Sequence, residues 1–130
     1  MFREYNAHPK GLKTTDCSVR AFATALNKDY LECRRELNQI KKVFGFKSYK
    51  DHEFVFEYLK DYPRLKFKAV KGEPRLKGSG FTELYPKGTY VLSMTGHLTC
   101  CKDGVILDIW DCSYLTVYTA WEIKNKKEMN

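Results

Sequence analysis

The chain has 130 residues, of which 43% are hydrophobic and 15% aromatic, and it carries a formal net charge of +7. This length suits a single domain spanning residues 1–130, and the apolar content excludes an intrinsically disordered chain. No segment approaches the roughly 18 consecutive apolar residues of a membrane span, and Met1 to Lys13 contain no apolar run typical of a signal peptide. We therefore expect a cytoplasmic protein with no membrane partner.

Five cysteines are present, and no two of them have the C-x-x-C spacing of common redox and zinc motifs. An odd number cannot pair completely within one chain, so we expect free thiols in a reducing compartment. The cysteines are Cys17, Cys33, Cys100, Cys101 and Cys112.

The first half of the chain is predicted to be helical. Thr14, Thr15 and Asp16 are N-cap candidates before an alanine-rich segment with helical apolar spacing, which places Cys17 in the first turn. Two more helices are expected over Tyr30 to Lys42 and from Asp51 to about Asp61. The residues predicted to face inward in these two helices are Leu31, Leu37, Ile40, Phe54, Val55, Tyr58 and Leu59.

The second half is predicted to contain strands. Strands are expected at 65–70, 89–94, 97–101 and 105–110 and within 114–123, and the Gly-, Pro- and Lys-rich segment 71–80 is predicted to be a loop. Helices followed by an antiparallel sheet indicate the α+β class.

Asp103-Gly104, between two apolar segments, predicts a two-residue hairpin turn. This turn pairs Thr99 with Asp108 and places His97 on the same face as Asp108, within reach of longer side chains. The opposite face is almost wholly apolar and is the predicted core face; it holds Leu98, Cys100, Val105, Leu107 and Ile109. A register slip of one residue would turn Asp108 to that face and make Asp111 the rival carboxylate.

Cys17, His97 and Asp108 together suggest nucleophilic chemistry. A thiol at a helix N-terminus has a lowered pKa because of the helix dipole, and its neighbouring N–H groups can stabilise an oxyanion. A carboxylate that bonds one imidazole nitrogen fixes the tautomer and leaves the other nitrogen free for proton transfer. These three residues are therefore the candidate catalytic residues.

Two segments resemble papain-like cysteine peptidases. TTDCSVRAFATAL resembles their nucleophile helix, and GHLTCCKDGVILDIWDCS resembles their His strand, hairpin and Asp strand. The similarity is greatest to small single-domain members from phages and bacteria. It implies a papain-like fold with N-terminal helices on an antiparallel sheet, and a cysteine hydrolase in which Cys17 is the nucleophile, His97 the base and Asp108 its orienter. It also implies an oxyanion donor before the nucleophile, for which Asn6 is the candidate because no Gln precedes Cys17.

The partner implied by this resemblance is a peptide or protein substrate, or the peptide of bacterial peptidoglycan, and neither a cofactor nor a metal is expected. A zinc site from His97, Cys101 and Cys112 matches no common spacing. One alternative is a papain-fold binding protein without activity, such as a phage inhibitor of a host factor. Another is a nucleic-acid binder, because basic residues alternate with aromatic ones in segments 41–50 and 66–71, although core packing is the favoured explanation of those aromatics.

Overall fold

The computed structural model describes residues 1–49 and 51–124; Lys50, in the first basic segment, lies outside them. The helices are α1 (Cys17–Ala25), α2 (Tyr30–Phe44), α3 (His52–Tyr58) and α4 (Gly78–Leu84). The strands are β1 (Phe2–Glu4), β2 (Arg64–Lys66), β3 (Thr89–Met94), β4 (His97–Lys102), β5 (Val105–Asp108) and β6 (Val117–Ile123). The α+β class is confirmed.

The six strands form one mixed sheet in the order β1-β5-β4-β3-β6-β2. Every neighbouring pair is antiparallel except β1 and β5, which run parallel with Phe2 opposite Ile106. The prediction of a purely antiparallel sheet was therefore wrong. The short segment Phe2–Glu4 has no alternating pattern of its own and is a strand because it pairs with the edge of β5.

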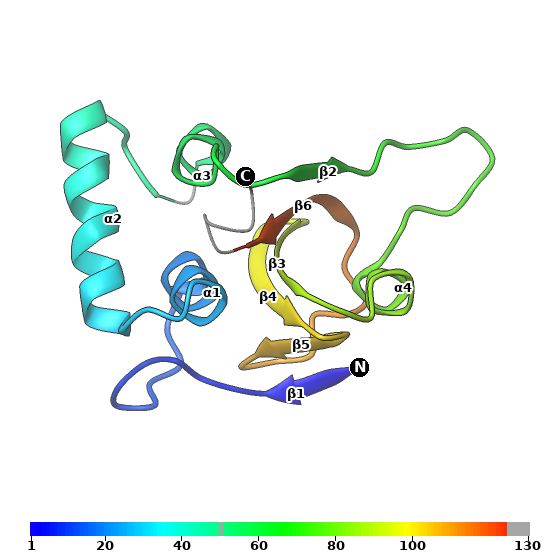
Figure 1. The fold of residues 1–130 in the computed structure, drawn as a ribbon, viewed down its shortest axis with the longest axis horizontal. Coiled ribbons are helices and arrows are strands. Elements are labelled where there is room, and N and C mark those ends of the chain that lie inside the picture. Colours follow the sequence, from blue (N-terminus) through cyan, green and yellow to red (C-terminus); the bar gives the residue numbers. More distant parts are fainter. Residues whose placement is uncertain (50, 125–130) are drawn as a thin grey trace.

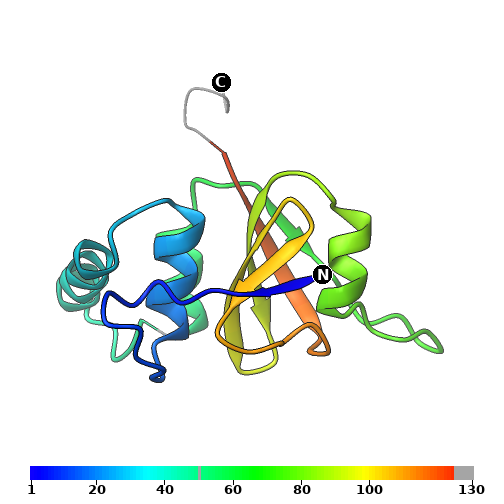
Figure 2. The ribbon, with the colours of Figure 1, turned by 90° about the horizontal axis from the view of Figure 1, so that it is seen from below.

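Helices cover both faces of the sheet. Figure 1 shows α1, α2 and α3 on one side of the strands and α4 on the other, and Figure 2 shows the same three layers from below. Two clusters of buried side chains result: one includes Phe22, Phe54 and Trp121, and the other includes Phe81 and Ile106.

The helix α4 was not predicted, since Gly78, Ser79 and Gly80 in its first turn have the composition of a loop. Gly78 suits the close packing of α4: a Cβ there would lie 2.7 Å from the end of the flexible Met94 side chain and 3.1 Å from the Ser113 Cα. Phe81 of this helix is fully buried against the sheet. Tertiary packing therefore outweighs the weak helix propensity of the segment.

Because α4 covers the sheet, the predicted division into one core face and one polar face was wrong. Leu98 and Cys100 are buried as expected, but Val105, Leu107 and Ile109 are only half-buried. On the opposite face Cys101 and Ile106 are fully buried.

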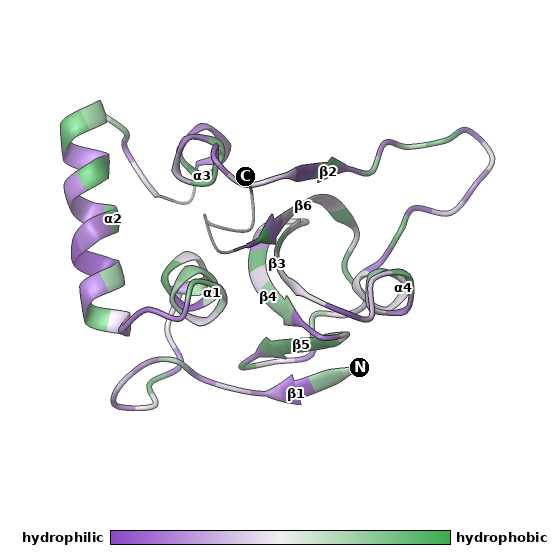
Figure 3. Cartoon of the chain, in the orientation of Figure 1, coloured by the Kyte–Doolittle hydropathy of each residue, from purple (hydrophilic) through white to green (hydrophobic). Residues whose placement is uncertain are grey.

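Most inward-facing positions of α2 and α3 were predicted correctly, with the exception of Leu31, which is 41% exposed. In α2 only Tyr30, Cys33 and Leu37 are buried, and Figure 3 shows that much of this helix is hydrophilic whereas β5 is predominantly hydrophobic. The narrow buried stripe of α2 runs along one side of the helix and excludes Leu31. No helix within the described residues has the length and apolar composition needed to cross a membrane.

The hairpin between β4 and β5 has the predicted register. Cys101 pairs with Ile106 and Lys102 with Val105, and both turn residues, Asp103 and Gly104, have positive φ angles of 49° and 75°. Three strands differ in length from prediction: β4 extends to Lys102, one residue beyond the predicted 97–101, β5 ends at Asp108 instead of Trp110, and β2 spans Arg64–Lys66 instead of 65–70.

Candidate active site

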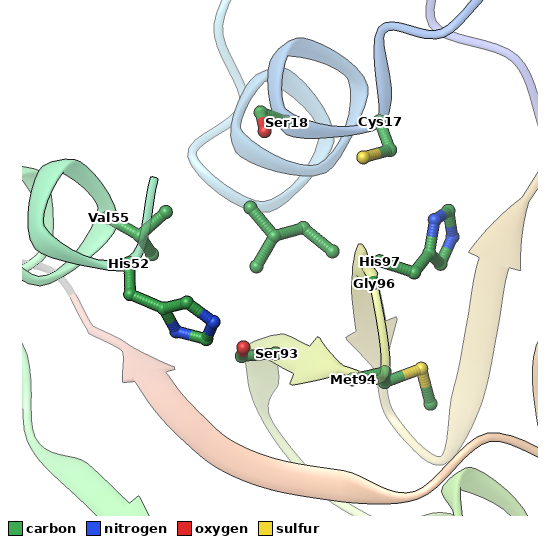
Figure 4. Close-up of a pocket in the computed structure, with 9 residues that line it drawn as sticks. Cys17, Ser18, His52, Val55, Ser93, Met94, Gly96 and His97 are labelled. Atoms are coloured by element: carbon green, nitrogen blue, oxygen red, sulfur yellow. The ribbon is translucent and has the colours of Figure 1, made fainter. Parts of the chain in front are cut away.

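Cys17 is the first residue of α1 and is half-buried. The N–H groups in the first turn of a helix have no intrahelical acceptors, and the helix dipole places positive potential at this end. The thiol faces His97 (Figure 4), and the interaction with this ring helps to lower the pKa of Cys17. At the start of α1, Cys17 thus has amide donors of its own helix nearby and the His97 ring of β4 beside it.

His97 is the first residue of β4 and lies between Cys17 and Asp108. Its Nε2 is 2.7 Å from Asp108 Oδ2, which leaves Nδ1 as the ring nitrogen available to the Cys17 thiol. Gly96, directly before it, has a φ of 60°, and this turn starts the strand at His97. The indole of Trp110 packs on the imidazole, with 4.8 Å between ring centroids.

Asp108 ends β5 and is 3% exposed. Both oxygens of its carboxylate accept hydrogen bonds, as a buried polar group requires. The partners are Arg20 Nη1 at 2.9 Å and the Ile109 N–H at 2.7 Å on Oδ1, and His97 Nε2 at 2.7 Å, Thr99 Oγ1 at 2.6 Å and Cys112 Sγ at 3.6 Å on Oδ2. These bonds fix the side of the carboxylate that faces the imidazole.

A buried network behind these three residues was not predicted from the sequence. Arg20, in α1, donates from Nε to Asp16 Oδ1 at 2.7 Å and from Nη1 to Asp108. Tyr30 donates its hydroxyl to the other oxygen of Asp16 at 2.5 Å. The spacing of Asp16 and Arg20 by four residues was the available signal, because such pairs meet on a helix. The contact of Arg20 with Asp108, 88 positions away, has no local signal.

The pKa of Cys17 is shifted in the opposite direction from the pKa values of three other thiols. Burial alone would raise the pKa of Cys17, but hydrogen bonds with His97 and the Leu98 backbone, and the charges of His97 and Arg20, lower it. Burial raises the pKa of Cys33 and Cys101 to about 11 and that of Cys100 to about 12. All five cysteines are free.

His97 and Asp108 stabilise each other's charged forms. Burial acts to lower the pKa of His97, but the hydrogen bonds with Asp108, Cys112 and Cys17 outweigh it and raise the pKa to about 11. Burial acts to raise the pKa of Asp108, yet hydrogen bonds from His97 and Thr99 lower it to about 2. Both groups are charged at neutral pH, and Cys17 therefore faces an imidazolium.

Two cavities meet at the Cys17–His97 pair. One, of about 210 Å³, extends toward His52 and Ser93; the other, of about 290 Å³, extends toward Thr15 and Trp110. Cys17, Gly96 and His97 line both cavities. A chain could therefore lie across the thiol with groups on either side of it.

Two other residues suggested by the sequence are not at this site. The Asn6 amide donates to the Leu12 carbonyl at 2.9 Å and accepts from the His8 N–H at 3.0 Å, and Asn6 lines neither cavity. Asn6 thus closes its own loop rather than facing the nucleophile. Asp111 is exposed and accepts from the Ser113 hydroxyl and N–H, so it caps a turn instead of contacting His97.

Within the described part of the chain, the residues best placed to hold a metal overlap with the same site. His97, Asp108 and Cys112 each offer one ligand atom, and these atoms lie within 4.8 Å of one another. Cys101, which the sequence suggested, is not in this group. The Arg20 guanidinium already bonds Asp108, and a second cation there would be repelled. The arrangement suits proton transfer better than metal binding.

The aromatic residues of the first basic segment differ in their packing. Phe46 and Tyr49 are half-buried and pack against Phe54, at centroid distances of 5.5 Å and 6.3 Å, whereas Phe44 is 59% exposed. Two of these three rings therefore contribute to the core instead of forming an open stacking surface.

Comparison with known proteins gives no relative for this chain. No protein-family model, no curated protein and no solved structure matches it.

Proposed function

We propose that this protein is a cysteine hydrolase of the papain-like type, which cleaves an amide bond through a thioester on Cys17. The observation that carries the proposal is the position of His97, which lies beside Cys17 on one side (Figure 4) and bonds Asp108 at 2.7 Å on the other. The three residues come from α1, β4 and β5, so that the fold alone brings them together. Nucleophile, base and orienter in this relation are what acyl transfer by a thiol needs.

The first half of the reaction forms the acyl-enzyme. The Cys17 thiolate attacks the carbonyl carbon, and the carbonyl π pair moves to oxygen. The N–H groups at the start of α1 stabilise this oxyanion, and the Thr15 hydroxyl, which lines the adjoining cavity, is a second donor. When the C–N bond breaks, the His97 imidazolium gives its proton to the leaving amine. The product is a Cys17 thioester and a free amine.

The second half releases the acid. Neutral His97 takes a proton from water, the hydroxide attacks the thioester carbonyl, and the Cys17 sulfur leaves as the thiolate. His97 is then protonated again, and the starting ion pair is restored. Asp108 remains ionised throughout and keeps the imidazole in its orientation. Its five hydrogen-bond partners hold the carboxylate in place for this role.

The substrates that we propose are a protein or peptide, or the peptide of a bacterial cell wall. The cleft formed by the two cavities is open on either side of the thiol, which suits an extended chain better than a small molecule. Neither step requires a cofactor.

The test is Cys17-dependent amide cleavage. The protein is incubated under reducing conditions with a mixture of unmodified peptides and with purified peptidoglycan, and new termini are identified by mass spectrometry. Wild type and Cys33→Ser should cleave, and Cys17→Ser should not, although it keeps the wild-type thermal midpoint. Cleavage that survives Cys17→Ser, or no cleavage of either substrate class, overturns the proposal.

A further inference from the structure

The cavity of about 210 Å³ beside Cys17 has chemically distinct parts. Cys17 and His97 lie at one side of it, and His52 and Ser93 lie at the other, with the His52 ring directed toward the Ser93 side (Figure 4). Between these polar groups the lining is apolar and comes from Val55, Met94 and Leu98. A side chain with an apolar stem and a polar end fits this arrangement, in which apolar walls lie between polar groups.

Ser18 supplies an independent observation. It follows Cys17 in α1, lines the same cavity and is completely buried, and its Oγ has no hydrogen-bond partner among the described residues. Buried hydroxyls without a partner are uncommon in folded proteins. A ligand that brings a polar atom to this wall of the cavity would satisfy the hydroxyl once the neighbouring apolar side chains move aside to expose it.

The charges around the cavity restrict what that polar atom belongs to. Among the described residues that line it, none is a lysine or arginine, and the charge of the His97 imidazolium is already balanced by Asp108 and by the Cys17 thiolate. A carboxylate would therefore lie between apolar walls without a cation free to pair with it, and next to the Cys17 thiolate, which is unfavourable. A purely apolar side chain would leave the Ser18 hydroxyl unpaired. A carboxamide is neutral and both donates and accepts, which suits the two serine hydroxyls and the imidazole.

We propose that this cavity selects one of the substrate residues flanking the scissile bond and favours a side chain that ends in a carboxamide, read by Ser18, His52 and Ser93. This inference rests on the proposed hydrolase function and names the substrate class of that site. The three residues determine specificity and take no part in bond breaking.

The experiment compares cleavage of peptides that differ at single positions on both sides of the cleaved bond. At one position wild type should favour glutamine or asparagine over the near-isosteric methionine or leucine by at least about tenfold. Ser18→Ala, Ser93→Ala and His52→Leu should each reduce this preference, while cleavage of the methionine peptides is retained. The preference is measured as the ratio of kcat/KM values.

Thr119→Val is the matched control. Thr119 is 7% exposed and pairs with Ser93 across β3 and β6, but it does not line the cavity. Its loss removes a hydroxyl from the same part of the sheet and should leave the preference unchanged.

The outcomes separate the two proposals. If Cys17-dependent cleavage shows no carboxamide preference, favours an acidic residue, or keeps its preference in all three variants, the specificity inference is overturned and the hydrolase proposal stands. If Cys17-dependent cleavage is absent, both fail.

Discussion

Arg20 and Asp108 form a buried ion pair with 2.9 Å between Nη1 and Oδ1, and this pair joins the helix of Cys17 to the strand that ends beside His97. The same guanidinium bonds Asp16, so one cation neutralises two buried carboxylates. The side chain of Arg20 is 8% exposed. Arg20, which the proposed reaction does not use directly, therefore links α1 to β5.

Replacing Arg20 by methionine should lower the free energy of unfolding by about 3–5 kcal/mol, because it leaves Asp16 buried without a cation and Asp108 paired with His97 alone. Arg20→Lys should lose less, since it keeps the charge but cannot bond both carboxylates in the same way. Urea denaturation at pH 7 measures both changes.

The control for Arg20 is Lys28→Met. Lys28 bonds Glu36 at 2.9 Å, but its side chain is 38% exposed, so the loss should be within about 1 kcal/mol. Equal losses for Arg20→Met and Lys28→Met would show that burial of the Arg20 pair adds nothing to stability.

Iodoacetamide should alkylate Cys17 at pH 6 at least about tenfold faster than Cys33, since only a thiolate reacts and the pKa of Cys17 is lowered whereas that of Cys33 is raised to about 11. His97→Gln should remove most of this advantage, because the imidazolium is the nearest source of positive charge. Peptide mapping of the labelled protein gives the rate at each thiol.

The same labelling on Cys33→Ser tests whether the sites are independent, and the rate at Cys17 should not change. A Cys17 that reacts no faster than Cys33 in the folded protein contradicts an activated thiolate.

His97 should stabilise the fold in a pH-dependent way. Its pKa is raised from 6.5 to about 11, so the folded state holds the proton more tightly than the unfolded state does. The contribution is therefore complete below about pH 6.5 and is lost as the pH rises toward 11. The difference in unfolding free energy between wild type and His97→Gln should shrink from pH 6 to pH 9.5 in urea titrations.

For Asp108 we expect the opposite dependence at acid pH, where its contribution to the free energy of unfolding should increase with pH. Its pKa is lowered from 3.8 to about 2, so its contribution is present above pH 3.8 and is lost as the pH falls toward 2.

For the His97 prediction, a difference in unfolding free energy between wild type and His97→Gln that stays constant from pH 6 to pH 9.5 would mean that the fold does not hold His97 protonated.

How much of this site the sequence predicts depends on the range of each contact. The Asp103-Gly104 turn is a local signal and predicts the register that brings His97 near Asp108. The helix start at Cys17 is local as well. The Arg20–Asp108 hydrogen bond spans 88 positions, and no pattern within either segment predicts it.

Two elements of the fold were missed for a related reason. The strand Phe2–Glu4 forms because it pairs with β5, and the helix Gly78–Leu84 forms because it packs on the sheet, so neither follows from its own propensity. Once α4 covers the second face, Cys101 and Ile106 are buried, and the prediction of a single core face cannot hold. Asn6 was suggested by its place in the chain alone, and its bonds within the loop were not predictable from spacing.

The Asp103-Gly104 turn between β4 and β5 can be tested by substitution at either of its residues. Gly104 has a φ of 75°, a conformation that costs other residues about 1–2 kcal/mol, and a Cβ would lie 3.4 Å from the Thr82 carbonyl oxygen. Gly104→Ala should therefore lower the free energy of unfolding by about that amount. Asp103→Asn should be nearly neutral, because asparagine tolerates positive φ and its side-chain oxygen can still accept from the Gly88 N–H.

The labelling rate of Cys17 distinguishes stability from site geometry in these variants. Six residue pairs join β3 to β4, and Arg20 and Thr99 hold Asp108 independently of the turn. Folded Gly104→Ala should therefore keep the rapid alkylation of Cys17 seen in wild type. If this variant folds but labels Cys17 as slowly as His97→Gln does, the turn alone holds His97 and Asp108 together, because the other contacts then fail to keep the register.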